Sequence, residues 1–323
     1  MSLAGSAPAG SFRLCKILDV DIYVNFWLVA FFVYRILQAS GSWYRPAWWS
    51  VSYAFFTELI LFLTVLVHEF GHGLMTRKIG GSIDKVLLWP LGGICYSIMP
   101  YSGSSREKVL NDFKVVVAGP ATHWIQGPFW AALMKASFPS VDVWQFFNPF
   151  ISHSFPNNVA KSAVGELVCY ILASAISINA ALFIFNAFLP MYPLDASKIL
   201  TSTLQLRFNF SPERTADWLI VISGLSATGF LVHGIITASR QGGAGNSITL
   251  LIGAMSLAET FQLKNLRDTG RLASHPLFSH AGSNDGSLGS RHSPASGRSS
   301  RGNLIFNESG RPLVDGADVS GRV

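Results

Sequence analysis

The stretch VSYAFFTELILFLTVLVHEFGHGLM, residues 51–75, decides the fold and the chemistry of this chain. Its first seventeen or so residues are mostly apolar, which predicts a helix that crosses a membrane. The stretch then carries His68, Glu69 and His72. Residues four apart lie one above the other on a helix, so His68 and His72 can offer both imidazoles to one metal ion, with Glu69 beside them as a general base. Because ionisable groups inside a span are costly, the pattern predicts a metal site rather than a coincidental polar cluster.

The composition is that of a polytopic membrane protein. Half of the residues are hydrophobic and 13% are charged, whereas a soluble chain carries about 25% charged residues. The mean hydropathy is positive. We therefore interpret the net charge of +6 as membrane topology and expect no nucleic-acid partner. Cys15, Cys95 and Cys169 are far apart and show no metal-ligand spacing, so we expect them to be reduced.

Hydropathy predicts an all-α polytopic membrane protein with about six transmembrane helices. The expected spans are about 20–38, 52–75, 115–136, 164–189, 216–238 and 247–263. After the second span, VLLWPLGGICYSIM has two short apolar pieces around Gly92 and Gly93, which predicts a re-entrant β-hairpin. The domains then follow as an N-terminal cytosolic segment (1–16), a membrane-embedded domain (17–266) and a disordered cytosolic tail (267–323) rich in Ser, Gly and Arg.

The distribution of basic residues predicts an integral membrane protein with both termini in the cytosol. Of the 24 Lys and Arg residues, five lie beyond residue 290 in the tail, far from the last span, where charges orient spans poorly. With six spans and a cytosolic N-terminus, fourteen of the other nineteen lie on the cytosolic side. The five on the opposite side are Arg35, Arg45, Lys135, Lys161 and Arg240.

The end of the fourth predicted span supplies a candidate for a third metal ligand. It reads NAFLPMYPLD from Asn186 to Asp195, and its two prolines break or kink the helix. In the predicted topology the second and fourth spans run in the same direction, so Asp195 and HEFGH belong to the same leaflet. A catalytic zinc site needs three protein ligands, and HEFGH supplies two. We expect Asp195 to be the third ligand, and Glu259 in the sixth span is the alternative.

Four pieces of sequence together resemble the site-2 protease family of intramembrane zinc metalloproteases. In the family's order they are HEFGH, PLGGI at 90–94, AGP at 118–120 and N-x-x-x-P-x-x-P-L-D at 186–195. The resemblance covers about residues 15–265. It implies one zinc ion per chain bound by His68, His72 and Asp195, with Glu69 as the catalytic base. The residues with an implied supporting or substrate-binding role are Asn186, Gly92, Gly93 and Pro193.

The resemblance also implies an activity and its partners. It predicts hydrolysis of peptide bonds within or near the transmembrane segment of single-span membrane proteins in the lipid bilayer, releasing a cytosolic fragment. Zinc would activate a water molecule and Glu69 would take its proton. An extended substrate that pairs with the hairpin at 86–98 would recover the hydrogen bonds that it loses on unwinding.

Three positions depart from the family pattern. Ala196 stands where the family usually has Gly, which would strain the site if a positive φ or a close approach is needed there. Asn186 lies four residues before Pro190 instead of three. His123 stands where the family often has Asn, either as support for the site or as a hydrogen-bonded interior histidine.

Three alternatives remain open from the sequence. The first is a catalytically weak or inactive relative that binds membrane proteins without cutting them, which Ala196 favours. The second is a zinc peptidase that trims prenylated proteins, with Glu259 as its third ligand. The third is a metal transporter, which would spread polar residues over several spans near the midplane.

Overall fold

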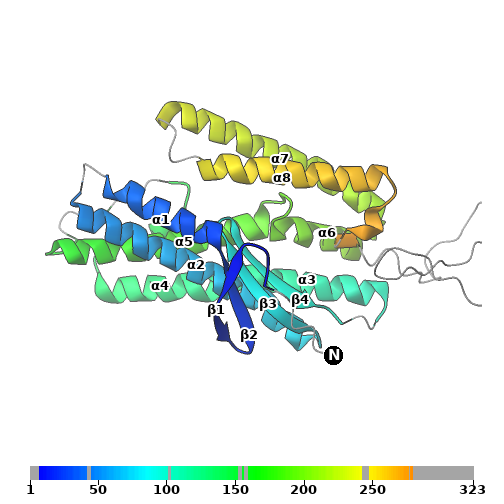
Figure 1. Cartoon of the computed structure of the whole chain (residues 1–323), viewed down its shortest axis with the longest axis horizontal. Coiled ribbons are helices and arrows are strands. Elements are labelled where there is room, and N and C mark those ends of the chain that lie inside the picture. Colours follow the sequence, from blue (N-terminus) through cyan, green and yellow to red (C-terminus); the bar gives the residue numbers. More distant parts are fainter. Residues whose placement is uncertain are drawn as a thin grey trace, which may run out of the picture. The chain divides into compact units, whose positions relative to one another are not determined.

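Helices make up most of the chain, and a small sheet packs beside them (Figure 1). In the computed structural model, the described residues are 7–41, 45–100, 103–151, 155, 159–241, 247–275 and 277–278. Eight helices lie in these ranges: α1 (Phe26–Ser40), α2 (Ala47–Lys78), α3 (Ser105–Ala121), α4 (His123–Ser137), α5 (Ala163–Phe188), α6 (Asp195–Phe208), α7 (Pro212–Gln241) and α8 (Ser247–Asp268). A short 3₁₀ turn, Val143–Phe147, lies between α4 and α5, and another, Leu272–Ser274, follows α8. The first residues of the predicted disordered tail are folded, because the end of α8 and the turn Leu272–Ser274 belong to it, and Leu272 and Phe278 are buried. From residue 279 onward the tail lies outside the described residues.

The expectation of an all-α chain is wrong, because four strands form one sheet in the order β1-β2-β3-β4. They are β1 (Ser11–Ile17), β2 (Val20–Asn25), β3 (Ser82–Trp89) and β4 (Gly92–Ile98). The outer pairs are antiparallel and the central pair β2–β3 is parallel. The hairpin expected around Gly92 and Gly93 is therefore present as β3–β4, but it belongs to a larger sheet.

The predicted first span is a strand followed by a short helix. Val20, Ile22 and Val24 alternate along β2 and are all buried, so their period of two residues places them on the core face. Helix α1 begins at Phe26, and the side chain of Asn25 caps it by accepting a hydrogen bond from the backbone N–H of Trp27. The prediction was wrong here because β-branched residues at strand spacing were merged with the apolar helix that follows them.

Among the residues that the structure describes, three helices are long and apolar enough to cross a membrane: α2, α5 and residues 212–239 of α7. They correspond to the second, fourth and fifth predicted spans. Helix α1 has 15 residues, about 22 Å of helix, which is short of a hydrocarbon core of roughly 30 Å. The predicted third span is divided between α3 and α4 at Thr122. The predicted sixth span falls on α8, which is not one of these three helices. The full count of six spans therefore stays a prediction.

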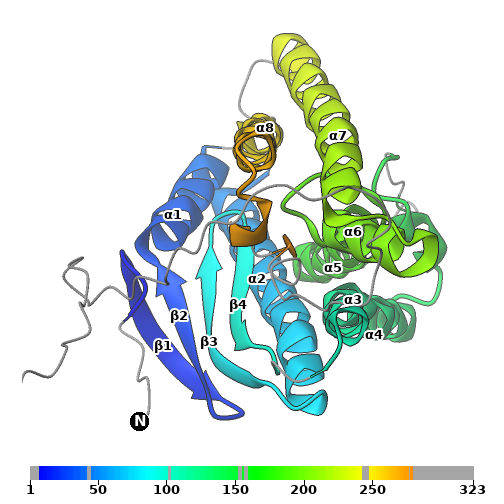
Figure 2. The ribbon, with the colours of Figure 1, turned by 90° about the vertical axis from the view of Figure 1, so that its right-hand side faces the viewer.

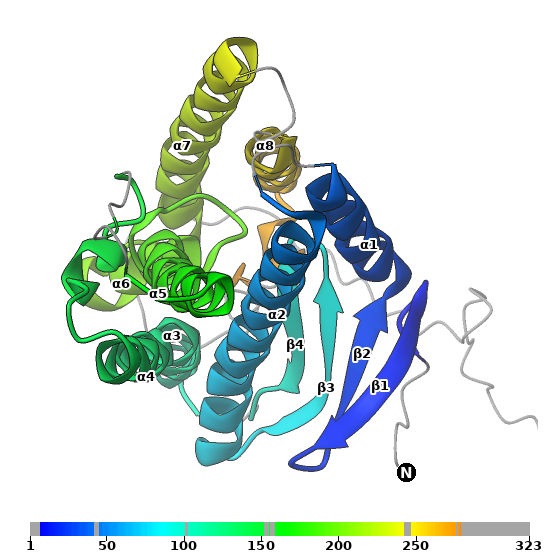
Figure 3. The ribbon, with the colours of Figure 1, turned by 90° about the vertical axis from the view of Figure 1, so that its left-hand side faces the viewer.

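Helix α2 lies between the sheet and the helices α3 to α6, as Figure 2 and Figure 3 show from opposite sides. It contacts β3 and β4 on one side and α3 and α5 on the other. The buried residues of β2 and β3 pack with Val65 and Phe70 of α2 in one apolar cluster. Gly73 of α2 permits this packing, because a Cβ atom there would lie 2.6 Å from Cδ1 of Ile83. The sheet therefore fixes the face of α2 that turns toward α3 and α6.

Candidate metal centre

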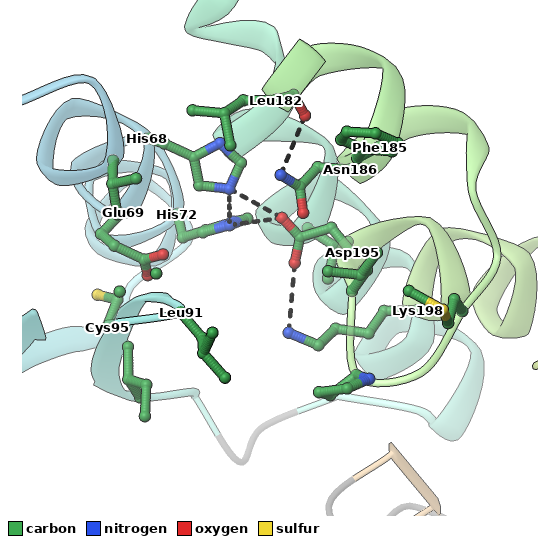
Figure 4. A pocket seen from close by; sticks show the side chains of 18 of the residues that line it. His68, Glu69, His72, Leu91, Cys95, Leu182, Phe185, Asn186, Asp195 and Lys198 are labelled. Carbon is green, nitrogen blue, oxygen red and sulfur yellow. Dashed lines mark hydrogen bonds and ion pairs between the residues drawn. The ribbon is translucent and has the colours of Figure 1, made fainter. Parts of the chain in front are cut away.

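Three side chains predicted as metal ligands converge on one point. Nε2 of His68 lies 2.9 Å from Oδ2 of Asp195, and Nε2 of His72 lies 3.0 Å from the same oxygen. The two Nε2 atoms are 3.1 Å apart (Figure 4). Within the described part of the chain, this is the only group of three His, Cys, Asp or Glu side chains whose ligand atoms lie within 4.8 Å of one another. Glu259, the alternative ligand, is not part of it.

Local geometry explains the approach of the three residues. His68 and His72 are one turn apart on α2, and Asp195 is the first residue of α6. Helix α3 passes close to both imidazoles, since a Cβ atom at Gly119 would lie 2.8 Å from Nε2 of His68 and closer still to the ring of His72. The AGP piece at 118–120 thus lets α3 pack directly against the two imidazole rings, because Gly119 has no side chain.

The donor set fits a zinc ion. Nδ1 of His72 lies 2.8 Å from the carbonyl oxygen of Val115, which can only accept, so Nδ1 donates and Nε2 keeps its lone pair. That lone pair faces a carboxylate oxygen of Asp195 and Nε2 of His68. A proton bridges only two such atoms, whereas a metal ion can bind all three. Two imidazole nitrogens and one carboxylate oxygen form a ligand set that suits Zn²⁺.

The second oxygen of Asp195 points away from the histidines. Oδ1 lies 3.3 Å from Nζ of Lys198, one turn further along α6 (Figure 4). The carboxylate is therefore oriented at both ends, with Oδ2 toward the imidazoles and Oδ1 toward the ammonium group. Lys198 was not among the predicted site residues, although its i, i+3 spacing from Asp195 is a signal for such a pair.

Glu69 lies beside the ligands without joining them. Its side chain is buried, and it packs against β4. A Cβ atom at Gly93 would lie 2.9 Å from Cδ of Glu69 and 3.0 Å from Oε1, so only Gly leaves room for this carboxylate. Gly92 has a φ of +142° at the start of β4, in a region that favours glycine. The two glycines therefore have different structural roles.

A cavity of about 490 Å³ brings the predicted site residues together. Its lining includes all of them: His68, Glu69, His72, Gly92, Gly93, Asn186, Pro193 and Asp195. Apolar side chains from several helices, among them Phe185, Phe230 and Met255, form other parts of the wall. The cavity thus combines a polar cluster with apolar surfaces, which is the usual character of a ligand site.

The structure shows the surroundings of two of the three residues that depart from the family pattern, Asn186 and Ala196. The side-chain amide nitrogen of Asn186 donates to the carbonyl oxygen of Leu182 on its own helix, at 3.0 Å, and not to His68, His72 or Asp195. Ala196 belongs to α6 and is not among the residues with positive φ. The concern that Ala at this position strains the backbone through a positive φ is therefore wrong.

The third departure, His123, contacts the site directly. Its Nε2 lies 3.1 Å from Nδ1 of His68, and its Nδ1 lies 3.0 Å from Oδ1 of Asn179. Both residues are buried, with exposed fractions of 4% and 1%. Of the two interpretations left open for His123, support for the site agrees with this contact. The sequence offered one signal for Asn179, a polar residue inside an apolar span.

Comparison with known proteins identifies the class. Residues 56–229, more than half of the chain, match the family model of peptidase family M50, and the chain belongs to this family. This match includes both histidines, Glu69 and Asp195, and it agrees with the resemblance seen in the sequence.

Individual relatives are more distant. The chain is 26% identical over 201 residues to a zinc metalloprotease of Methanocaldococcus jannaschii, which covers 62% of this chain and 47% of the relative. It is 28% identical over 143 residues to stage IV sporulation protein FB of Bacillus subtilis, covering 44% and 38%. The chain thus spans about half, or less than half, of the length of these two curated relatives. A solved structure, the site-2 protease from M. jannaschii, covers 78% of this chain and 94% of its own, with a TM-score of 0.47 and 21% identity.

Proposed function

We propose that this chain is an intramembrane zinc endopeptidase that cleaves single-span membrane proteins within or near their transmembrane segment. The observation that carries the proposal is the convergence of His68, His72 and Asp195 on the wall of a cavity that also contains Glu69. Membership of peptidase family M50 supports the class of reaction. Three protein ligands leave one position open for water or substrate, as catalytic zinc sites require, so we propose one zinc ion per chain.

The proposed chemistry divides between the metal and Glu69. A zinc ion held by three side chains supplies Lewis acidity, which acidifies water and polarises a peptide carbonyl. Glu69 takes the proton of the attacking water and returns it to the leaving nitrogen. Burial of Glu69 against Gly93 keeps its carboxylate in a fixed position for both transfers. Lys198 keeps Asp195 oriented through Oδ1.

We propose that substrate binds along β4. A helical substrate hides its carbonyl groups in hydrogen bonds, so the cleaved stretch has to unwind. β4 is an edge strand of the sheet formed by the described residues, and its residues line the cavity beside Glu69. An extended segment added to this edge recovers main-chain hydrogen bonds. The apolar wall formed by Phe185 and Phe230 then accommodates the side chains of the substrate.

We also propose a topology of six crossings with both termini in the cytosol, and release of a cytosolic fragment. The proposal includes the segment 1–16, the membrane-embedded domain 17–266 and the cytosolic tail 267–323. The asymmetry of Lys and Arg supports the orientation. Labels at positions 45, 150 and 243 should report the outside, and labels at 103, 205 and 290 the cytosol. A cytosolic signal at 150 would contradict this topology.

The central experiment is cleavage of a single-span substrate by the purified chain in lipid vesicles. We expect cleavage that a zinc chelator abolishes and added zinc restores. His68→Ala should lose activity, whereas His233→Ala, a change on the exposed face of α7, should keep it. Wild-type protein that binds zinc but cleaves no substrate would instead support the inactive relative that binds membrane proteins. Chelator-resistant cleavage would overturn the zinc mechanism.

A further inference from the structure

We propose that His123 and Asn179 are positioning residues that fix which ring nitrogen of His68 carries its proton. The relay that they form runs from the backbone of α5 through α4 to the metal ligand on α2. It keeps the lone pair of His68 Nε2 directed at the proposed zinc position. The inference rests on the proposed metal site, but not on whether the chain cleaves substrate.

The relay starts at the carbonyl oxygen of Ala175, which can only accept a hydrogen bond. The amide nitrogen of Asn179 lies 2.9 Å from the carbonyl oxygen of Ala175. A carbonyl has no proton to give, so the amide must turn its NH₂ group toward Ala175. Its oxygen Oδ1 then faces Nδ1 of His123 at 3.0 Å. Because Oδ1 can only accept, Nδ1 of His123 carries a proton and donates.

The neutral ring of His123 transmits the direction of these hydrogen bonds to His68. This ring is buried and has no hydrogen-bonded carboxylate partner, and an unpaired buried charge is costly. With its proton on Nδ1, a neutral His123 has a lone pair on Nε2. That nitrogen lies 3.1 Å from Nδ1 of His68, which must donate. His68 is therefore left with a lone pair on Nε2, the atom that faces Asp195 and His72.

The two histidine ligands thus reach the same tautomer by different means. Nδ1 of His72 donates directly to a backbone carbonyl, that of Val115. Nδ1 of His68 meets a side chain instead, and two residues are needed to reach a backbone acceptor on α5. Outer partners of this kind set the tautomer and orientation of metal-binding histidines, and their loss typically costs about 10–100-fold in metal affinity.

Zinc affinity of the purified chain, measured by competition with a chromophoric chelator, tests the relay. We expect His123→Leu and Asn179→Leu each to lower the affinity by about 10–100-fold. His123→Gln should retain most of it, because its amide can accept from His68 and donate to Asn179. The double variant should bind no more weakly than His123→Leu, since Asn179 acts only through His123. The matched control His233→Leu, on the exposed face of α7, should bind as wild type.

A second measurement reads the tautomer itself. In metal-free protein labelled with ¹⁵N in the histidine rings, we expect Nδ1 of His68 to carry a proton. Asn179→Leu should give a mixture of proton positions on His123. The His123→Ala and Asn179→Ala pair replaces the Leu variants if these fail to fold, as judged by circular dichroism.

Each outcome bears on one claim. Unchanged zinc affinity in folded Asn179→Leu, fully additive losses in the double variant, or His68 without a proton on Nδ1 would overturn the relay. A wild-type chain that binds zinc with the expected tautomer but cleaves nothing would overturn the proposed function and leave the relay standing. A wild-type chain that binds no zinc would overturn the metal site on which both depend.

Discussion

Helix α2 and the junction between α5 and α6 supply the two halves of the metal centre in different ways. Helix α2 contributes His68, Glu69 and His72 from one unbroken helix, so helical geometry alone fixes their relative positions. The opposite half contributes Asp195 only after α5 has ended at Phe188 and α6 has begun. Its position depends on how α6 packs. We infer that Glu69 can lose its chemistry without a change in geometry, whereas the contribution of Asp195 depends on the packing of α6 as well as on its own charge.

The largest effect should come from Glu69→Gln on α2. The change keeps the shape of the side chain but removes the proton acceptor, so turnover should fall by about 10²–10⁴-fold. Zinc content and fold should stay unchanged. The matched control is Glu58→Gln, which changes another buried carboxylate of α2 that does not line the metal cavity, and it should keep its turnover. Equal cleavage by wild type and Glu69→Gln, with zinc bound to both, would contradict the assigned role.

Asp195→Asn tests the other half of the centre. The amide cannot supply a charged oxygen between the two imidazoles, so zinc affinity should fall by more than the 10–100-fold typical of an outer partner. Metal analysis of purified protein measures this. Glu259→Gln should keep its zinc, because Glu259 lies outside the ligand cluster. Loss of zinc in the Glu259 variant with retention in the Asp195 variant would reverse the assignment.

Gly119→Ala should have an intermediate effect, because it presses α3 against both histidines. The new Cβ atom would lie 2.8 Å from Nε2 of His68, and crowding of this kind typically costs about 1–3 kcal/mol. Thermal unfolding and zinc content should both show the loss. Gly229→Ala on α7, where a Cβ atom meets nothing within 4 Å, should be neutral or stabilise the helix by up to about 1 kcal/mol. Identical behaviour of the two variants would contradict the close packing.

The smallest effect should come from Ala196→Gly. Ala196 lies in the first turn of α6 with no positive φ, so Gly offers no relief of backbone strain. We expect unchanged zinc affinity and a loss of stability below about 1 kcal/mol in a denaturant titration. A clear rise in zinc affinity or turnover would show that the missing methyl group matters for a close approach, and that Ala196 weakens the site.

The local half of the site could be predicted from sequence because its signal is local. His68 and His72 are four apart in an apolar helix, and this spacing has one structural meaning. Asp195 could be expected from ligand count and topology. The N-terminal strands could not be read in the same way, because Ile22 and Val24 pair with β3 more than sixty residues later. In sequence they look like the start of an apolar span.

The relay and the glycine contacts were also beyond sequence reasoning. His123 and Asn179 are 56 residues apart and on different helices, and a hydrogen bond between them leaves no local pattern. Gly93 and Gly119 could be recognised as glycines in motifs, but the atoms that they avoid belong to α2. In both cases the missing information is the packing of helices and strands around α2, which depends on every contact of the cluster at once.

The parallel pairing of β2 with β3 has a consequence for the order of assembly. During synthesis β1 and β2 are made before α2, and β3 and β4 are made after it. The register that joins Val24 to Leu88 can form only when α1 and α2 have both been made and have returned the chain to the sheet. The loop that this pairing closes is long, so it belongs to the late and slow steps of folding. Until then the edges of β2 and β3 stay unpaired, which makes the newly made chain most prone to aggregation at this stage.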